Sequence, residues 1–318
     1  MNPERTDDLQ PTVVIAGASG FIGTHLRRRF LRDGFRVASI GRQASDDARW
    51  DAGDRGLTAA LEGAEAVINL AGRSVSCRYT KRTADEILRS RTETTETLGR
   101  ALASCSRPPS VWLNASTGTI YRDARDRPQD ERTGKLGSGF SVAVARAWEQ
   151  ELAEAPTAVR KIALRTTIAL GTGGALNPII NLARMGFGGP QGDGGQRFSW
   201  IHVDDVYGAV RHLMDRPDIS GPVNLAAPEA VTNRELMDRV RRHVGGAGER
   251  VAVPLPAWSL EAGARIIRTE AELVLKSRWV HPGVLLDSGY RFAFPALDDA
   301  LADIAAATPR GLLPVPLG

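Results

Sequence analysis

Short apolar segments alternate with longer amphipathic segments along the first half of the chain. The run Thr12–Ala16 is apolar and rich in β-branched residues, which predicts a buried strand. After a glycine-rich stretch, apolar residues recur at helical spacing over Phe21–Leu31, and Gly34 ends the predicted helix. Phe35–Ile40 predicts a second strand, so these residues form one strand–helix–strand unit.

The same alternation continues to about residue 170. Three further apolar runs predict buried strands at Ala66–Leu70, Val111–Ala115 and Val159–Ala169. Amphipathic segments predict helices over Thr83–Cys105 and Ser141–Ala155. Strands that are apolar throughout and alternate with helices are typical of a parallel sheet covered on both faces. The sequence therefore predicts an α/β fold with a doubly wound Rossmann sheet.

The pattern changes in the second half of the chain. The segment Gly171–Gly195 is rich in glycine and predicts loops, which often border substrate sites. A short strand at Val223–Ala226 and a helix at Thr232–Val244 follow. We therefore expect a Rossmann domain over 1–170 and a smaller substrate lobe with a C-terminal module over 171–318, with an interleaved border.

Three glycines recur at every third residue directly after the first predicted strand. In a dinucleotide site, the first glycine allows a tight turn and the second lets the backbone approach the pyrophosphate. The third lets helix and strand pack closely, and the phosphates then meet the positive end of the helix. The predicted cofactor-binding residues of this loop are Gly17, Ser19, Gly20, Phe21, Ile22 and Gly23.

The residue after the second predicted strand indicates which dinucleotide binds. An acid at this place usually binds the ribose hydroxyl of NAD, whereas an arginine accommodates the 2′-phosphate of NADP. Here the residue is Arg42, about 20 residues beyond the third glycine. Ser19 could also hydrogen-bond that phosphate. The sequence thus predicts NADP(H) as the cofactor of the 1–170 domain, the alternative being a surface arginine that binds nothing.

Composition and charge limit the classes of partner and the cellular compartment that we expect for this protein. The formal net charge is +4, but the arginines are dispersed and form no basic stripe, so we expect no nucleic-acid partner. Cys77 and Cys105 belong to no Cys/His cluster, so we expect no metal, and such low cysteine use fits the reducing cytoplasm. No apolar run approaches the roughly 20 residues of a membrane helix. We expect a cytoplasmic protein with a small-molecule substrate and no membrane partner.

Segments spread over the whole chain carry a family resemblance. They include VVIAGASGFIGTHL, AVINLAG, LRTTIALGTGGAL, GFGGPQGDGGQRFSWIHVDD and GPVNLAAPEAVTN, and a C-terminal piece that ends SGYRFAFP. Together they resemble extended, atypical short-chain dehydrogenases/reductases, in the epimerase/dehydratase-like subgroup with an extra C-terminal module. The resemblance implies pairing of two copies through the helices Thr83–Cys105 and Ser141–Ala155. It also implies five more cofactor-binding residues: Asn69, Leu70, Ala71, Gly72 and Arg91.

The catalytic pair of that family is absent from this chain. Ordinary members carry Tyr-x-x-x-Lys on a helix, where residues i and i+4 share a face and the lysine lowers the pKa of the tyrosine. Here Phe140 and Val144 occupy those two places, and neither can transfer a proton. The standard mechanism of carbonyl reduction is therefore in doubt.

Hydroxyl groups after the fifth predicted strand are the remaining catalytic candidates. Ser116 and Thr117 stand where the family keeps its substrate-binding hydroxyl, which can hydrogen-bond a carbonyl. Tyr121 is a candidate proton donor, with packing of its loop as the alternative. Arg125, at i+4 from Tyr121, could lower the pKa of Tyr121 if this segment were helical, but the segment TIYRDARDRPQDE indicates a loop. Arg165 is expected to have a structural role, paired with Asp204 or with an acidic substrate.

Two predictions concern the second half of the site. The loop Gly186–Gly195 is expected to cover the substrate, with Phe187, Phe198 and Trp200 making the pocket partly apolar. Asp205 is expected to act as a helix cap or a buried acceptor, because such acids in this segment are usually structural.

Three functions are compatible with these residues. The first is an NADP(H)-dependent oxidoreductase that acts on a small organic substrate through a non-standard active site. The second is a redox-neutral epimerase, dehydratase or cyclase on the same fold. The third is an NADPH-binding protein without catalysis. We favour the first because the cofactor motif is intact and hydroxyl groups follow the fifth strand, although fold alone does not fix function.

Overall fold

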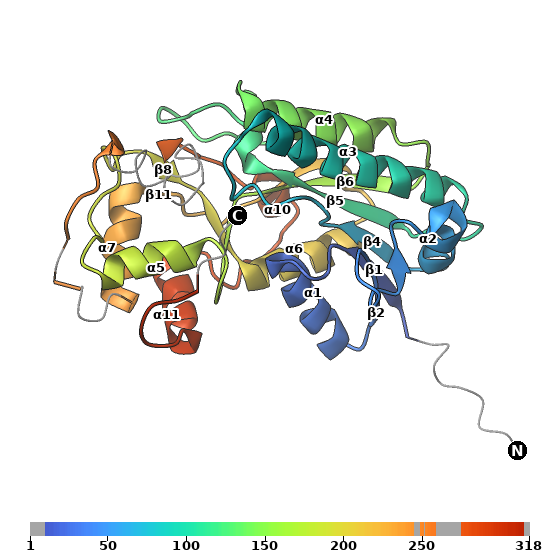
Figure 1. The fold of residues 1–318 in the computed structure, drawn as a ribbon, viewed down its shortest axis with the longest axis horizontal. Coiled ribbons are helices and arrows are strands. Elements are labelled where there is room, and N and C mark those ends of the chain that lie inside the picture. Colours follow the sequence, from blue (N-terminus) through green and yellow to red (C-terminus); the bar gives the residue numbers. More distant parts are fainter. Residues whose placement is uncertain (1–9, 245–248, 251, 259–274, 315–318) are drawn as a thin grey trace, which may run out of the picture.

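A seven-stranded parallel sheet forms the larger part of the molecule (Figure 1). The computed structural model describes residues 10–244, 249–250, 252–258 and 275–314. The strand order is β10-β6-β5-β4-β1-β2-β3, so the chain runs outward in both directions from β1 and β4. This arrangement confirms the predicted doubly wound Rossmann sheet. The strands are β1 (Thr12–Ala16), β2 (Arg36–Gly41), β3 (Ala48–Arg49), β4 (Ala66–Asn69), β5 (Val111–Thr117), β6 (Arg160–Thr166) and β10 (Gly221–Leu225).

Helices cover both faces of the sheet, as Figure 1 shows. Successive side chains of a strand point to opposite faces of the sheet, so alternate residues of β1 pack against the helices of the two layers. Val13 and Ile15 belong to the core shared with α1 and α6, whereas Val14 and Ala16 belong to the core shared with α2 and α3. The helices of the two layers are α1 (Phe21–Arg32), α6 (Val203–Met214), α2 (Gly53–Leu61), α3 (Lys81–Ala103) and α4 (Phe140–Glu154).

A smaller lobe stands beside the carboxyl ends of the strands (Figure 1). Its core contains Trp200, Leu236 and Leu301, all fully buried. The elements of this lobe and its border are β7 (Ile168–Leu170), α5 (Leu176–Arg184), β8 (Arg197–Phe198), β9 (Trp200–His202), β11 (Val231–Thr232), α7 (Asn233–Val244) and α11 (Leu297–Ala307). Two short elements pack beside the main sheet: η2 (Gly118–Ile120) contacts α4 and β6, and α10 (Gly283–Asp287) contacts β10.

The two parts of the chain interleave in space. Both α6 and β10 come after residue 170, yet β10 pairs with β6 in the main sheet and α6 packs on α1. The glycine-rich segment that predicted only loops contains α5, so that prediction was wrong there. Leu176, Ile180 and Ala183 form the buried stripe of α5, and this apolar packing outweighs the glycines on either side of the helix.

Candidate dinucleotide site and its neighbouring hydroxyl network

The glycine loop lies at the carboxyl end of β1, where β4 passes close beside it. Gly17 has φ +79°, and a Cβ atom there would come within 2.9 Å of the backbone of Leu70 and Ala71. A Cβ atom on Gly23 would overlap the carbonyl oxygen of Gly17. The first and third glycines are therefore required by packing within the protein.

Gly20 differs from the other two glycines of the loop. The protein atom nearest to an added Cβ is the Gly17 oxygen at 3.5 Å, which is ordinary contact, and Gly20 is exposed. Nothing within the described residues therefore demands a glycine there. A ligand that approaches the backbone from outside would demand one, because a side chain would keep it away.

The amino end of α1 opens onto the same space. Gly20 is its N-cap residue, no side chain accepts a hydrogen bond there, and the first turn carries no acid. The free N–H groups and the positive end of the helix dipole therefore favour an anion. Phe21 anchors the turn, because its ring lies against the backbone of Gly174. Ile22 packs on the core beneath, and Ser19 is exposed at the tip of the loop.

Arg42 directly follows β2, the strand that pairs with β1, and its side chain is exposed. The Asp46 carboxylate turns back over this strand end and accepts a hydrogen bond from the Gln43 N–H at 2.8 Å. In the part of the chain that the structure describes, no carboxylate forms an ion pair with Arg42. Its guanidinium can therefore meet an anionic ligand without first breaking such a pair.

Asn69 shapes the loop that faces the glycines. Its side chain is fully buried, donates to Asn114 Oδ1 at 2.7 Å and accepts from the Ala71 N–H at 3.1 Å. These bonds fix the turn that brings Leu70 and Ala71 against Gly17. Asn69 therefore acts on this edge through the backbone that it positions, since its own side chain points into the core.

Arg91 of α3 lies at the end of that loop. Its guanidinium contacts Gly72, stacks over the Trp148 ring with its carbon 5.1 Å from the ring centre, and donates to the Ile87 carbonyl at 2.9 Å. Burial lowers the pKa of this guanidinium. A cation buried to this extent is costly unless something compensates its charge.

A polar network fills the space between β5, β6 and α4. Ser116 donates to Glu149 Oε1 at 2.6 Å. Arg165 binds both oxygens of the same carboxylate, from Nε at 2.8 Å and from Nη2 at 2.7 Å. Its third bond, from Nη1, reaches the Tyr121 hydroxyl at 2.9 Å, and that hydroxyl donates to Asn224 Oδ1 at 3.0 Å. The hydroxyls of Ser116 and Tyr121 therefore both have partners inside the protein.

One expectation about this network, the pairing of Arg165 with Asp204, is corrected, and the expected loop around Arg125 is confirmed. Arg165 pairs with Glu149, whereas Asp204 pairs with His25 and Arg29 of α1 at 2.8 and 2.6 Å. Arg125 lies in a loop and pairs with Asp193, away from the Tyr121 hydroxyl. Burial raises the pKa of Tyr121, and the nearby Arg165 guanidinium offsets that effect only in part.

Thr117 differs from its neighbours because it ends β5 and begins η2. It is half-buried, and its hydroxyl accepts a hydrogen bond from the Thr119 N–H at 3.1 Å. Two cations of the C-terminal segment hold the same short helix. Lys276 donates to the Thr119 carbonyl at 3.0 Å, and Arg278 donates to the Thr119 hydroxyl at 3.1 Å. The C-terminal module thus closes on the strand end that carries Thr117.

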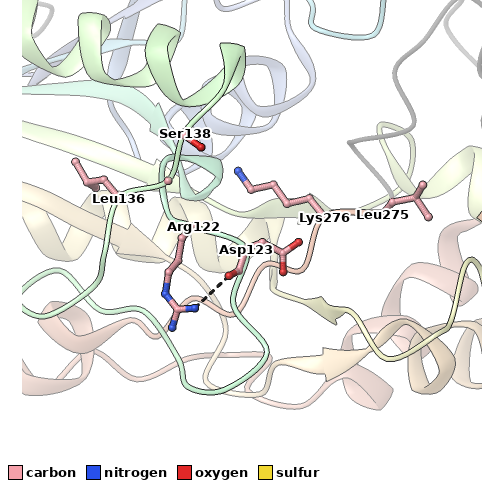
Figure 2. A pocket seen from close by; sticks show the side chains of 7 residues that line it. Arg122, Asp123, Leu136, Ser138, Leu275 and Lys276 are labelled. Carbon is pink, nitrogen blue, oxygen red and sulfur yellow. Dashed lines mark hydrogen bonds between the residues drawn. The ribbon is translucent and has the colours of Figure 1, made fainter.

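A cavity of about 590 Å³ opens beside this contact. Figure 2 shows Lys276 and Arg122 in it, with Leu136 and Leu275 standing on either side. Arg122 donates to the Asp123 carbonyl at 3.2 Å, which is the dashed line in that figure. The remaining lining residues are Asp123, Gly137 and Ser138, and the last two lie three and two residues before the start of α4.

The aromatic residues that were expected to make a substrate pocket partly apolar are placed differently from one another in the structure. Trp200 is fully buried in the core of the smaller lobe, whereas Phe187 is exposed and pairs with Ala252. The loop Gly186–Gly195 packs on the segment around Val253, with the Gly189 N–H donating to the Val253 carbonyl at 3.1 Å. Trp200 and Phe198 therefore belong to the core of the lobe, whereas Phe187 does not.

Asp205 has the structural role that its place suggested. Its carboxylate is fully buried and accepts hydrogen bonds from the N–H groups of Ala293 and Phe294, at 2.7 and 2.9 Å. It also accepts from the Tyr290 hydroxyl at 2.9 Å. Asp205 thereby ties the C-terminal segment to α6.

Fold and loop geometry together define a Rossmann-type dinucleotide-binding protein with a second lobe. Residues 13–226 match the model of the NAD dependent epimerase/dehydratase family, and residues 255–304 match a domain of unknown function, DUF1731. The chain belongs to the NAD dependent epimerase/dehydratase family. The expected resemblance, including the extra C-terminal module, is thereby confirmed.

Individual relatives agree with this assignment. The epimerase family protein SDR39U1 of Bos taurus is 32% identical, covering 92% of this chain and 99% of its own length. The epimerase family protein YfhF of Bacillus subtilis is 27% identical, with coverages of 92% and 98%. A crystal structure of human SDR39U1 with NADPH has a TM-score of 0.82 at 30% identity, covering 93% of this chain and 99% of that chain.

No helix among the described residues is both long enough and apolar enough to cross a membrane. No group of three or more His, Cys, Asp or Glu side chains among them is arranged to hold a metal ion.

Proposed function

We propose that the protein is an NADP(H)-dependent oxidoreductase that acts on a small organic substrate. The observation that carries this proposal is the open cradle at Gly20, where uncapped N–H groups of α1 face solvent. Arg42 stands at the end of β2 with no acid paired to it among the described residues. The human relative SDR39U1 was crystallised with NADPH, which supports the same cofactor here.

The glycine loop and the β4 edge would hold this cofactor in different ways. The N–H groups at the start of α1 would bind the pyrophosphate, and Arg42 with Ser19 would bind the 2′-phosphate. The backbone of Leu70, Ala71 and Gly72 would line the ribose on the nicotinamide side, next to Arg91. When bound, NADPH supplies the hydride, which the protein itself cannot provide.

Thr117 is the hydroxyl that we propose to orient the substrate. Ser116 and Tyr121 are proposed to support it from behind, because their hydroxyls are bonded to Glu149, Arg165 and Asn224. The substrate would enter through the cavity beside Lys276. Arg122, Asp123 and Lys276 line that cavity together with two leucines, so we expect a partly apolar substrate with at least one polar or acidic group.

A redox-neutral reaction is the second candidate. It is favoured by the family to which the chain belongs and by Phe140 and Val144 in the places of the usual catalytic pair. An epimerase of this kind would keep its cofactor through each turnover, whereas an oxidoreductase must release it oxidised or reduced. An NADPH-binding protein without catalysis would show neither behaviour.

The test of cofactor choice uses titration calorimetry with NADPH and NADH. Arg42→Ala should weaken NADPH binding roughly 10- to 150-fold, since a hydrogen bond to a charged group contributes about 1.5–3 kcal/mol. NADH binding should be unchanged. Arg36→Ala is the matched control, because Arg36 is exposed at the opposite end of β2. The cofactor proposal fails if neither dinucleotide binds or if Arg42→Ala weakens both equally.

The test of reaction class follows the oxidation state of the cofactor. An oxidoreductase should consume NADPH, as read by its fluorescence, with some member of a panel of carbonyls, imines and enones. A redox-neutral enzyme should retain bound cofactor and release products of unchanged oxidation state. NADPH binding without any consumption across the panel contradicts the oxidoreductase proposal.

A homodimer in the cytoplasm belongs to the same proposal. The outward face of α3 carries the ion pairs Arg89–Glu93 and Arg100–Glu96, with N–O distances of 2.6 and 2.7 Å. A dimer contact through that face would be polar, so salt would weaken it. Sedimentation velocity tests this, and the fraction of dimer should be smaller at high salt than at low salt. Cys77 and Cys105 are free thiols, as a reducing compartment would keep them.

A further inference from the structure

Arg91 of α3 is a cation with few hydrogen-bond partners inside the protein. A guanidinium has five N–H donors, and one of them, from Nη1, reaches the Ile87 carbonyl with an N–O distance of 2.9 Å. Nε and Nη2 donate to no group among the described residues, and neither atom is sealed from solvent. Arg165, by contrast, uses all three of its nitrogens on Glu149 and Tyr121. One side of the Arg91 guanidinium is therefore open to a ligand.

No acid offsets the charge of Arg91. In the part of the chain that the structure describes, no carboxylate forms an ion pair with it, whereas Arg73 of the adjoining loop is paired with Glu86. Burial lowers the pKa of the Arg91 guanidinium, because the charged form loses its hydration. A cation in such a place is costly unless an anion compensates it. The described residues supply no such anion, so we look for it in a ligand.

The guanidinium is held in place on two sides. Its carbon lies 5.1 Å from the centre of the Trp148 ring, and Trp148 Nε1 donates to Thr95 Oγ1 at 3.0 Å. The Thr95 hydroxyl in turn donates to the Arg91 carbonyl at 2.8 Å, so the ring is fixed to the helix that carries Arg91. On the other side is Gly72, where a Cβ atom would come within 3.2 Å of the guanidinium carbon. A planar guanidinium fixed in this way matches the two oxygens of a carboxylate.

Apolar side chains lie one helical turn away from this cation. Ile87 stands one turn before Arg91 on α3, and Val144 stands one turn before Trp148 on α4. Ile87 and Val144 are buried in one cluster, against which Phe140 packs. Phe140 and Val144 are the residues in the places of the family's catalytic pair. The site thus combines an apolar wall with one fixed positive charge, which suits an organic anion that has an apolar part.

We propose that Arg91 binds the carboxylate of the substrate, and that the substrate is an oxo acid with an apolar side group. The proposal rests on the oxidoreductase function proposed above and names its substrate class. The cofactor is not the source of the anion. Its phosphates are bound by the N–H groups of α1 and by Arg42 in the arrangement proposed above, and its nicotinamide half carries no anionic group. Arg91 thus has a different ligand from the cofactor that the family resemblance implies for it.

The binding test compares carboxylates with their neutral amides. The probes are benzoate, phenylacetate and 3-phenylpropanoate, each titrated beside its amide into the protein saturated with NADP⁺ and followed by calorimetry. At least one carboxylate should bind roughly tenfold or more tightly than its amide, because a hydrogen bond between two charged groups is stronger than one to a neutral group. Equal affinity within all three pairs, or no binding of any carboxylate, overturns the proposal.

Three variants assign the preference to one residue. Arg91→Gln should abolish the preference for the carboxylate, and Arg91→Lys, which keeps the charge but not the planar fork, should retain part of it. Arg73→Gln is the matched control and should leave the preference unchanged, because Arg73 already has Glu86 as its partner. The affinity for NADPH should be the same in the wild type and all three variants. The assignment is wrong if the preference survives in Arg91→Gln, or if that variant loses affinity for NADPH, which would make the cofactor the ligand of Arg91.

A stability measurement separates a binding role from a structural one. Without ligand, Arg91→Gln should have a urea midpoint no lower than that of the wild type, because it removes a charge that nothing in the described protein compensates. Arg165→Gln should lower the midpoint, because it leaves the Glu149 carboxylate without its cation. An equally large fall in Arg91→Gln would show that Arg91 is structural and would refute the proposal.

These measurements are independent of the reaction on which the proposal rests. None of them follows the consumption of NADPH. A wild type that never oxidises NADPH therefore counts against the oxidoreductase function alone, whereas the titrations still decide whether Arg91 binds a carboxylate.

Discussion

The glycine loop and the hydroxyl network lie at the same edge of the sheet but are built in opposite ways. At the loop, main-chain N–H groups of α1 point outward and no side chain caps them. At the ends of β5 and β6, the hydroxyls of Ser116 and Tyr121 are bonded to Glu149, Arg165 and Asn224. The glycine loop therefore offers its backbone groups to a ligand, whereas the neighbouring strand ends use their polar side chains to hold the protein together.

The largest expected effect tests whether that network is structural. Glu149→Ala should lower the free energy of unfolding by about 3–5 kcal/mol, because it leaves the buried guanidinium of Arg165 without its carboxylate. Urea unfolding measures the change. Glu151→Ala on the same helix is the control, and it should stay within about 0.5 kcal/mol. A loss near zero for Glu149→Ala would mean that the network does not hold β5, β6 and α4 together.

The next prediction divides the glycine loop into its two roles. Gly23→Ala should lower the free energy of unfolding by about 1–3 kcal/mol, since its Cβ would overlap backbone that cannot move aside. Gly20→Ala should leave the unliganded protein within about 1 kcal/mol, because its Cβ meets nothing closer than 3.5 Å.

The affinity for NADPH should separate Gly20→Ala from its small effect on stability. Gly20→Ala should weaken NADPH binding at least roughly tenfold, a cost of about 1.4 kcal/mol, because the methyl group would stand between backbone and pyrophosphate. Calorimetry of the free proteins and titration with NADPH give the two measurements. If Gly20→Ala binds NADPH as the wild type does, the cradle is not the phosphate site.

Sequence alone predicted the sheet well because its strands are buried on both faces. A strand of that kind is apolar throughout, so β1 was located to the residue and β4 to within one residue. The start of α3 was placed two residues late. Thr80 and Thr83 cap that helix reciprocally, and this cap lacks the Glu or Gln that usually marks a capping box.

The candidate site was predictable only where it is local in sequence. The glycine loop is one short segment, so its spacing can be read directly. The network around Glu149 joins Ser116, which is 33 positions from Glu149 in the sequence, and Arg165, which is 16 positions from it. These three residues lie on three different elements.

The smallest expected effect concerns Tyr121, whose hydroxyl links the network to β10. Tyr121→Phe should cost about 1–2 kcal/mol, because Arg165 Nη1 loses an acceptor and Asn224 Oδ1 loses a donor. The folded-state pKa of Tyr121 is raised by burial, so its contribution to stability is present below the unfolded value of about 10 and is lost as the pH rises above it. The variant should therefore lose less stability than the wild type between neutral and alkaline pH, as urea unfolding at the two pH values would measure. If the variant loses as much stability as the wild type at alkaline pH, or if its affinity for NADPH falls, Tyr121 contacts the ligand and is not mainly a structural residue.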